Sequence, residues 1–208
     1  MTDLETKEKI IKAARVLFAD LGYEGTSVRE IAKTAEVNVA SVNYYFSSKE
    51  NLFLEIMRSG YRECAEDLKL LLEKNNGHLE DTLVDFLDHF LTNSHDLLSH
   101  FKMMMSSQHS HLLVSEGTED SSFGPPGGMI ISEALKKESP NSGPQDIIWA
   151  MRTLFSHVTH LSLIHTCCLR TNQNVAFSTK DDLEKSIRRI TRLVIQELKH
   201  PQHNANNL

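Results

Sequence analysis

The chain has 208 residues, which is enough for one large helical domain or for a small domain joined to a larger one. Apolar residues make up 40% and charged residues 24%, so the composition excludes a disordered or fibrous chain. The net charge is -6, and residues 1–50 are near neutral, with seven basic and eight acidic side chains. A broad positive field is therefore excluded, and any binding of nucleic acid must rest on few well-placed contacts.

No stretch approaches the roughly 18 uninterrupted apolar residues that a membrane span requires, and the N-terminus carries no basic leader before an apolar segment. The three cysteines, Cys64, Cys167 and Cys168, lack the spacing of a disulfide framework. We therefore expect a cytoplasmic protein with reduced thiols and no membrane partner.

Helical periodicity dominates the chain, and we find no convincing alternating strand run with hairpin chemistry. The sequence predicts an all-α fold. The first helix is expected at about 4–21, because apolar residues recur there at intervals of three and four and form one stripe. Gly22 follows as its expected C-terminal cap.

Two short helices joined by a tight polar turn are expected next. Ser27 and Glu30 form a capping box, in which each side chain accepts from the backbone N–H of the other residue. The helix that begins there reaches about Ala35. Asn38 is a favourable N-cap for a third helix at 39–45.

The rest of the chain is predicted to be helical with two irregular stretches. Ser47 and Glu50 repeat the capping pattern at the start of a long helix that runs to about Lys74 and could bridge two domains. The later helices are expected around 83–91, 97–105, 129–137, 145–169 and 180–199, the last capped by Thr179. Loops rich in Gly, Ser and Pro are expected at 115–128, where a lid is conceivable, and at 139–144.

The segment 26–46 has the geometry of a helix-turn-helix, with two short helices and a tight turn. The polar side chains expected on or near the surface of its second helix and the end of that helix are Ser41, Asn43, Tyr44, Tyr45 and Lys49. A DNA major groove suits such side chains, because an asparagine amide can pair with adenine, hydroxyls reach phosphates, and an aromatic ring packs on a thymine methyl.

The run SVREIAKTAEVNVASVNYYFSSKENL resembles the DNA-binding domain of the TetR family of repressors. The spaced residues that carry the resemblance are Phe18, Gly22, Tyr23, Thr26, Ser27, Val28, Ile31, Ala32, Val37, Tyr44, Phe46, Lys49 and Leu52. The resemblance implies phosphate contacts by Thr26, Ser27, Tyr45 and Lys49. It implies base contacts by Arg29, Ser41, Asn43 and Tyr44.

Two residues depart from the family pattern. Glu36 stands at the turn position where glycine is usual, and we expect it to strain the turn. Asn43 stands where tyrosine is common, and we expect it to alter the preferred DNA sequence.

The resemblance covers about the first quarter of the chain, and it implies an organisation for the whole. We expect a helix-turn-helix domain at 1–50 with its motif at 27–46, an effector-binding and dimerisation domain at 51–200, and a disordered tail at 201–208. The broad apolar faces of the helices at 145–169 and 180–199 fit a homodimer, which would place two recognition helices about one DNA turn apart.

Aromatic and methionine side chains in the C-terminal part could line a cavity for a hydrophobic or amphipathic small-molecule effector. The candidates are Phe86, Phe90, Phe101, Met103, Met104, Met105, Trp149 and Phe155. The same side chains at helical spacing could equally be plain core.

Metal sensing by histidines and redox sensing by cysteines are less favoured interpretations. His157 and His160 lie three apart on one predicted helix, and a second group comprises His95, His100, His109 and His111. Zinc normally needs three or four convergent ligands, so roles in interfaces or core hydrogen bonds are favoured over metal sensing. Inert packing is likewise favoured over redox sensing for the adjacent Cys167 and Cys168.

No nucleophile elbow, phosphate loop or cofactor fingerprint is present, so no catalytic residue and no cofactor are predicted. The favoured function is a repressor that leaves its operator when a small effector binds. An activator or ligand-independent DNA-binding regulator is the first alternative. A helical enzyme or binding module with a vestigial DNA-binding motif is the second.

Overall fold

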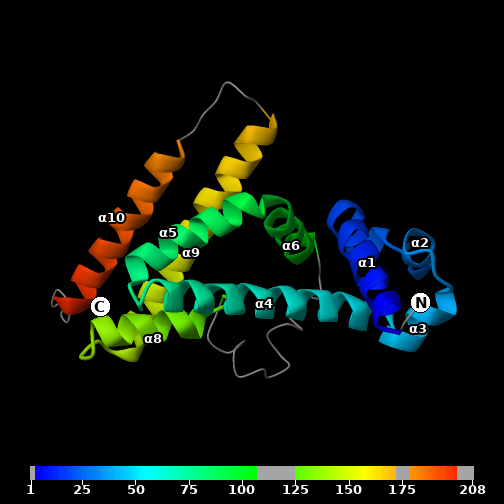
Figure 1. Cartoon of the computed structure of the whole chain (residues 1–208), viewed down its shortest axis with the longest axis horizontal. Helices are drawn as coiled ribbons and strands as arrows, with labels where there is room; N and C mark the ends of the chain where they lie inside the picture. The colour runs from blue at the N-terminus through cyan, green and yellow to red at the C-terminus, as the bar shows by residue number, and fades with distance from the viewer. Residues whose placement is uncertain (1–2, 107–124, 172–178, 201–208) are drawn as a thin grey trace, which may run out of the picture. The chain divides into compact units, whose positions relative to one another are not determined.

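The computed structural model describes residues 3–106, 125–171 and 179–200, without the side chains of 95–97, 104–106 and 168–171. In this part of the chain every regular element is a helix (Figure 1), which confirms the all-α prediction. The helices are α1 (Asp3–Gly25), α2 (Val28–Thr34), α3 (Val39–Phe46), α4 (Lys49–Lys74), α5 (Leu79–Thr92), α6 (Ser94–Ser106), α8 (Gly128–Glu138), α9 (Pro144–Thr171) and α10 (Lys180–Lys199). None of these described helices combines the length and apolarity that crossing a membrane requires.

The chain divides into two compact units, each built from two segments. The first unit comprises Met1–Arg62 and His95–Gly117, and the second comprises Glu63–Ser94 and Thr118–Leu208. Helix α4 contributes its first part to one unit and the remainder to the other. Most of the loop expected at 115–128 and all of the tail expected at 201–208 lie outside the described residues.

Three aromatic rings form the centre of the first unit. Phe18, Tyr23 and Phe53 come from α1 and α4, and their ring centroids lie 5.2 to 5.7 Å apart. All three side chains are buried, and burial of one such ring contributes about 2–3 kcal/mol. Ile31 of α2 and Val42 of α3 are buried in the same cluster, so one core holds these four helices together.

Helix α6 also belongs to the first unit, although it follows a long excursion of the chain. The side chain of Met103 is fully buried in the core that α1 to α4 form. The ring of His100 lies so close to Gly60 of α4 that a Cβ there would collide with it. Lys102 lies 3.9 Å from the carboxylate of Asp20 on α1. Helix α6 therefore completes the interior of this unit.

Local capping residues set the ends of the early helices as the sequence predicts. The Ser27 hydroxyl accepts from the Glu30 N–H at 3.2 Å, and the Glu30 carboxylate accepts from the Ser27 N–H at 2.8 Å. The Asn38 side chain accepts from the N–H of Ala40 at 2.9 Å. Gly22, with φ 74° and ψ 170°, breaks the helical backbone where the helix was expected to end, but α1 resumes and runs to Gly25. The caps at Ser27 and Asn38 are confirmed.

The predicted cap at Ser47 is wrong. Ser47 adopts φ 62° and donates its N–H to the Asn43 carbonyl, so it ends α3. An N-cap needs extended backbone, which this left-handed residue cannot supply. Ser48 takes the role instead, because its hydroxyl accepts from the N–H of Asn51 at 3.0 Å.

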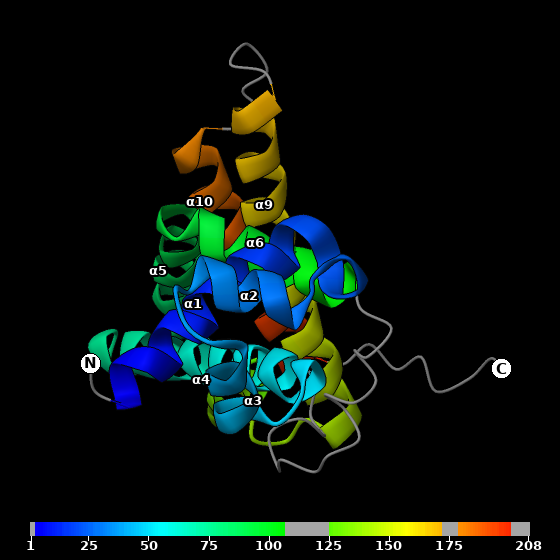
Figure 2. The same cartoon turned by 90° about the vertical axis from the view of Figure 1, so that its right-hand side faces the viewer.

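In the second unit, α9 and α10 pack against each other and against α5 (Figures 1 and 2). Helix α10 begins at the predicted Thr179 cap, and its inner face carries Leu183, Ile187, Thr191, Val194 and Leu198. The buried Thr191 hydroxyl donates to the Ile187 carbonyl at 2.8 Å, so this apolar face contains no unsatisfied hydroxyl at that position.

Ion pairs join the flank of α10 to the start of α5. The Arg192 guanidinium donates twice to Glu80, at 2.7 and 2.6 Å, and Arg188 donates to Glu80 at 3.2 Å and to Asp81 at 2.6 Å. Hydrogen bonds from Arg192, and then from Arg188, hold the pKa of Glu80 below its ordinary value. The bidentate geometry adds a directional contact between α10 and α5.

The turn between α2 and α3 contains Glu36 in the left-handed conformation, with φ 55°. Its N–H donates to the Lys33 carbonyl at 3.2 Å, and the Val37 N–H donates to the Ala32 carbonyl at 3.0 Å. This pair of hydrogen bonds is the Schellman motif, which usually places glycine where Glu36 stands. A side chain costs about 1 kcal/mol in this conformation.

Replacing Glu36 with glycine is therefore expected to raise the free energy of unfolding of the first unit by up to about 1 kcal/mol, part of the gain being offset by the greater entropy of the unfolded chain. Hydrogen exchange of buried amides in α1 and α2 measures the change for this unit. Glu36→Ala is the control, because it removes the charge and keeps the strained φ. A Glu36→Gly variant no more stable than Glu36→Ala would refute the assignment of strain.

Candidate nucleic-acid interface

The side chains on one face of α3 are exposed to solvent. Tyr44 has 76% of its surface exposed, and Asn43 beside it is exposed as well. Val42 and Phe46, on the opposite side, are buried in the core of the first unit. Because the buried side anchors α3, the exposed side presents polar and aromatic groups from a fixed backbone.

The exposed face of α3 includes two residues that the sequence analysis did not select. Val39 is 36% exposed and Ala40 is exposed, and they lie one turn before Asn43 and Tyr44. The helical spacing of four residues could have found them from the sequence. Small apolar side chains are suited to contact with a thymine methyl group. Ser41, which was selected, is half-buried at the edge of this face.

At the start of α2, Ser27 and Arg29 are exposed. The Ser27 hydroxyl accepts from the backbone N–H of Glu30 at 3.2 Å. Hydrogen bonds from the side chain and then the backbone of Ser27 lower the pKa of Glu30, so this carboxylate stays ionised while it caps the helix.

Thr26 has a different environment from the other selected residues, since only 2% of its surface is exposed. Its hydroxyl donates toward two carbonyl oxygens at the end of α1, that of Gly22 at 2.8 Å and that of Leu17 at 3.1 Å. The hydroxyl thus holds the link between α1 and α2 and is turned away from solvent.

The ammonium of Lys49 also binds backbone groups of the protein. It donates to the carbonyl oxygens of Tyr23, at 2.9 Å, and Thr26, at 3.1 Å. The same Nζ lies 4.1 Å from the centre of the Tyr23 ring. An ammonium has three protons, so one remains for an outside acceptor. Burial, with Glu50 and Glu24, raises the pKa of Tyr23.

Tyr45 is half-buried, and its ring stands at 80° to that of Tyr44, with the centroids 5.1 Å apart. Its hydroxyl donates to the carboxylate of Asp3 at 2.8 Å. The hydrogen bond to Asp3 is the largest cause that raises the pKa of Tyr45. Asp3 was not selected from the sequence, because nothing local joins residues 42 positions apart.

The residues selected for an effector cavity separate into several groups. Phe86, Phe90 and Phe155 form one aromatic cluster in the second unit, with centroids 4.4 Å apart for Phe86 and Phe90 and 6.3 Å for Phe86 and Phe155. Trp149 is 48% exposed, whereas Phe101 is 36% exposed and belongs to the first unit. Met103 is buried in that unit's core, and the side chains of Met104 and Met105 lie outside the described residues.

Among the described residues, no three His, Cys, Asp or Glu side chains converge as a metal site would require. His157 bonds to the Ser186 hydroxyl at 3.0 Å, and burial, with a smaller contribution from His160, lowers its pKa. Burial raises the pKa of the Cys64 thiol to about 12, which disfavours the reactive thiolate. His109, His111 and the side chains of His95 and Cys168 lie outside the described residues.

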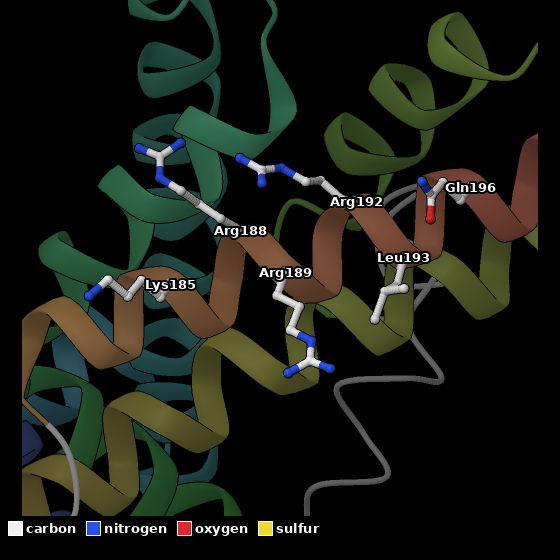
Figure 3. Close-up of a pocket in the computed structure, with 6 residues that line it drawn as sticks. All are labelled: Lys185, Arg188, Arg189, Arg192, Leu193 and Gln196. Atoms are coloured by element: carbon white, nitrogen blue, oxygen red, sulfur yellow. The ribbon is translucent and has the colours of Figure 1, made fainter.

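The outer face of α10 carries a surface hollow (Figure 3), lined by Lys185, Arg188, Arg189, Arg192, Leu193 and Gln196. Arg188 and Arg192 extend to one side of α10, where Glu80 and Asp81 bind them, and Arg189 and Leu193 extend to the other. Lys185 pairs with Asp181 on α10 itself. The carboxylates thus neutralise much of the positive charge of this hollow.

A short α2, a tight turn and an α3 with one exposed polar face together define a helix-turn-helix protein. The model of the family described as "Bacterial regulatory proteins, tetR family" matches residues 10–56, which include the whole of this arrangement.

Relatives and solved structures agree with that match. Over 66 residues the chain is 46% identical to "Probable HTH-type transcriptional regulator YttP" of Bacillus subtilis (strain 168), covering 32% of either chain. Over 85 residues it is 29% identical to the icaADBC operon negative transcriptional regulator IcaR of Staphylococcus aureus (strain Newman), covering 41% of this chain and 45% of IcaR. The matched part therefore spans less than half the length of these curated relatives.

The likeness of fold extends over nearly the whole chain. A structure from Mesorhizobium loti MAFF303099, assigned to the TetR family, superposes with a TM-score of 0.64 and 18% identity over 95% of this chain and 96% of that one. Residues 10–56 thus match the TetR family, as the sequence of this segment predicts. The family is described as one of bacterial regulatory proteins.

Replacing Thr26 with valine keeps the shape of the side chain and removes both hydrogen bonds. We expect the free energy of unfolding of the first unit to fall by about 1–2 kcal/mol, because the carbonyl of Gly22 loses its buried partner. Hydrogen exchange of amides in α1 and α2 reports the loss. Thr26→Ser keeps the hydroxyl and should lose less, so equal stability of the valine variant and the wild type would show that the hydroxyl has no structural role.

Proposed function

We propose that this chain binds operator DNA as a homodimer and represses transcription, and that a small hydrophobic or amphipathic effector releases it. The observation that carries the proposal is the exposed face of α3, on which Asn43 and Tyr44 project from a helix anchored by the core. In a helix-turn-helix protein this second helix enters the major groove. Operator DNA also implies a cytoplasmic location.

The contacts divide by chemistry. We assign base contacts to Asn43 and Tyr44 on the exposed face of α3, and further base contacts to Ser41 of the same helix and to the exposed Arg29 of α2. We assign phosphate contacts to the hydroxyl groups of Ser27, at the start of α2, and Tyr45, on α3. Thr26 and Lys49 are better described as positioning residues, since their polar atoms hold the link between α1 and α2.

The homodimer is proposed to form through α9 and α10. Each helix exposes large apolar side chains that nothing described in this chain covers, with Trp149 at 48%, Ile164 at 37% and Leu193 at 51% exposure. A second copy related by two-fold symmetry would bury the same set from both chains. It would also supply the second α3 that a pseudo-palindromic operator needs.

Other observations support the proposals that the protein represses transcription and that an effector releases it from DNA. IcaR, which matches part of this chain, is named a negative transcriptional regulator. We place the effector site at the apolar cluster of Phe86, Phe90 and Phe155 in the second unit, whose rings pack against one another. An effector lowers DNA affinity only if it prefers the conformation that does not bind, and a tenfold loss requires about 1.4 kcal/mol of such preference. Helix α4, shared by both units, is the continuous element available to transmit the change.

Truncating Tyr44 to alanine is expected to weaken binding to DNA from upstream of the chain's own gene by about tenfold or more, equal to about 1.4 kcal/mol. The fold should not change, because the Tyr44 side chain projects into solvent. A mobility-shift titration measures the affinity. Leu70→Ala, which truncates an exposed side chain on α4, is the matched control and should bind as the wild type does.

Wild-type affinity no better than for random DNA would end the regulator proposal in favour of a binding module or enzyme. The same titration with hydrophobic and amphipathic compounds separates a released repressor from a ligand-independent regulator. Reporter transcription that rises with the protein, rather than falls, would indicate an activator.

Introducing a charge at Leu193 tests the dimer. Leu193→Asp is expected to convert the dimer to a monomer of 23.6 kDa, because burying an unpaired carboxylate at a two-fold interface is costly. Sedimentation equilibrium measures the mass. Leu70→Asp places the same charge on another exposed leucine, at 62% exposure, and should leave the dimer intact. A wild-type chain that stays monomeric at all concentrations would refute the assembly.

A further inference from the structure

The hydroxyl of Tyr45 is held by the first turn of α1. It donates its single proton to Asp3 Oδ1 at 2.8 Å, although the two residues come from different helices. The Thr6 side chain also bonds to this phenol and opposes the effect of Asp3 on its pKa. The free protein therefore presents a Tyr45 whose proton already has a negatively charged acceptor.

A DNA phosphate that binds the Tyr45 hydroxyl would have to accept the same proton that Asp3 accepts. Phosphate oxygens are acceptors only, so a tyrosine hydroxyl binds them only by donating. While the proton is donated to Asp3, the phenol has no proton to donate to a phosphate. The Asp3 carboxylate resembles a phosphate in charge and in its acceptor oxygens, and Asp3 itself is exposed to solvent beside Tyr45.

We infer that Asp3 is an affinity-determining residue for DNA, because its carboxylate competes with a backbone phosphate for the hydroxyl proton of Tyr45. This inference rests on the proposed DNA binding and adds to it a residue outside the helix-turn-helix. Binding exchanges one charged acceptor for another, so the Tyr45 contact contributes less affinity than a free tyrosine would. The effect concerns the DNA backbone and is independent of base sequence.

Removing the carboxylate tests the competition. Asp3→Ala is expected to tighten binding by about fivefold on the upstream duplex and on a scrambled duplex of equal length, measured by fluorescence anisotropy. Glu8→Ala removes the same charge from an exposed position on α1 and measures the general electrostatic gain alone. The excess of Asp3→Ala over Glu8→Ala is the part that the inference assigns to Tyr45.

A double-mutant cycle isolates that part. In a Tyr45→Phe background, Asp3→Ala should gain no more than Glu8→Ala does, because no hydroxyl proton remains to be released. An equal gain in both backgrounds would show that Asp3 acts only as a charge and would overturn the inference.

A second measurement needs no DNA. The hydrogen bond to Asp3 raises the pKa of Tyr45, so the Asp3→Ala variant should have a lower Tyr45 pKa than the wild type when both are titrated by NMR of the ring. A lowered pKa with unchanged DNA affinity would overturn the inference and leave the proposed function intact. Failure of the wild-type protein to bind either duplex would overturn both.

Discussion

The ammonium of Lys49 fixes the junction on which the first unit depends. It binds two carbonyl oxygens in the short link between α1 and α2 and lies against the Tyr23 ring, which packs on Phe18 and Phe53. The Thr26 hydroxyl closes the same link from the other direction. A single charged group at the start of α4 thus holds the link that precedes α2, and the Ser27 capping box begins α2 directly after it.

Much of this arrangement could be predicted from the sequence, because the signals involved are local. The Ser27 and Glu30 capping box, the Asn38 cap and the Gly22 break all depend on residues within three or four positions. The prediction of a cap at Ser47 was wrong because it also used only local residues. The capping pattern does not reveal that Ser47 first has to end α3 in a left-handed conformation, which leaves Ser48 to begin α4.

The candidate site was predictable only in part. The sequence identified Asn43 and Tyr44 through the motif, but it could not show that Lys49 is held by backbone carbonyls, since that depends on the folded path of the chain. It missed Asp3 because 42 residues separate it from Tyr45. The apolar residues of the second unit follow helical periodicity whether they line a cavity or face outward, so Trp149 and Phe155 could not be distinguished without coordinates.

Met103 gives the first unit an unusual dependence on distant sequence. The residue is fully buried in the core built by α1 to α4, yet the chain supplies it only after Glu63–Ser94 has entered the other unit. A segment cut after α3 or midway through α4 would carry all the groups proposed to touch DNA and would lack this buried side chain. The helix-turn-helix segment therefore does not contain the whole of its own core. A chimaera that fuses this segment to a different C-terminal domain has to supply another side chain in place of Met103.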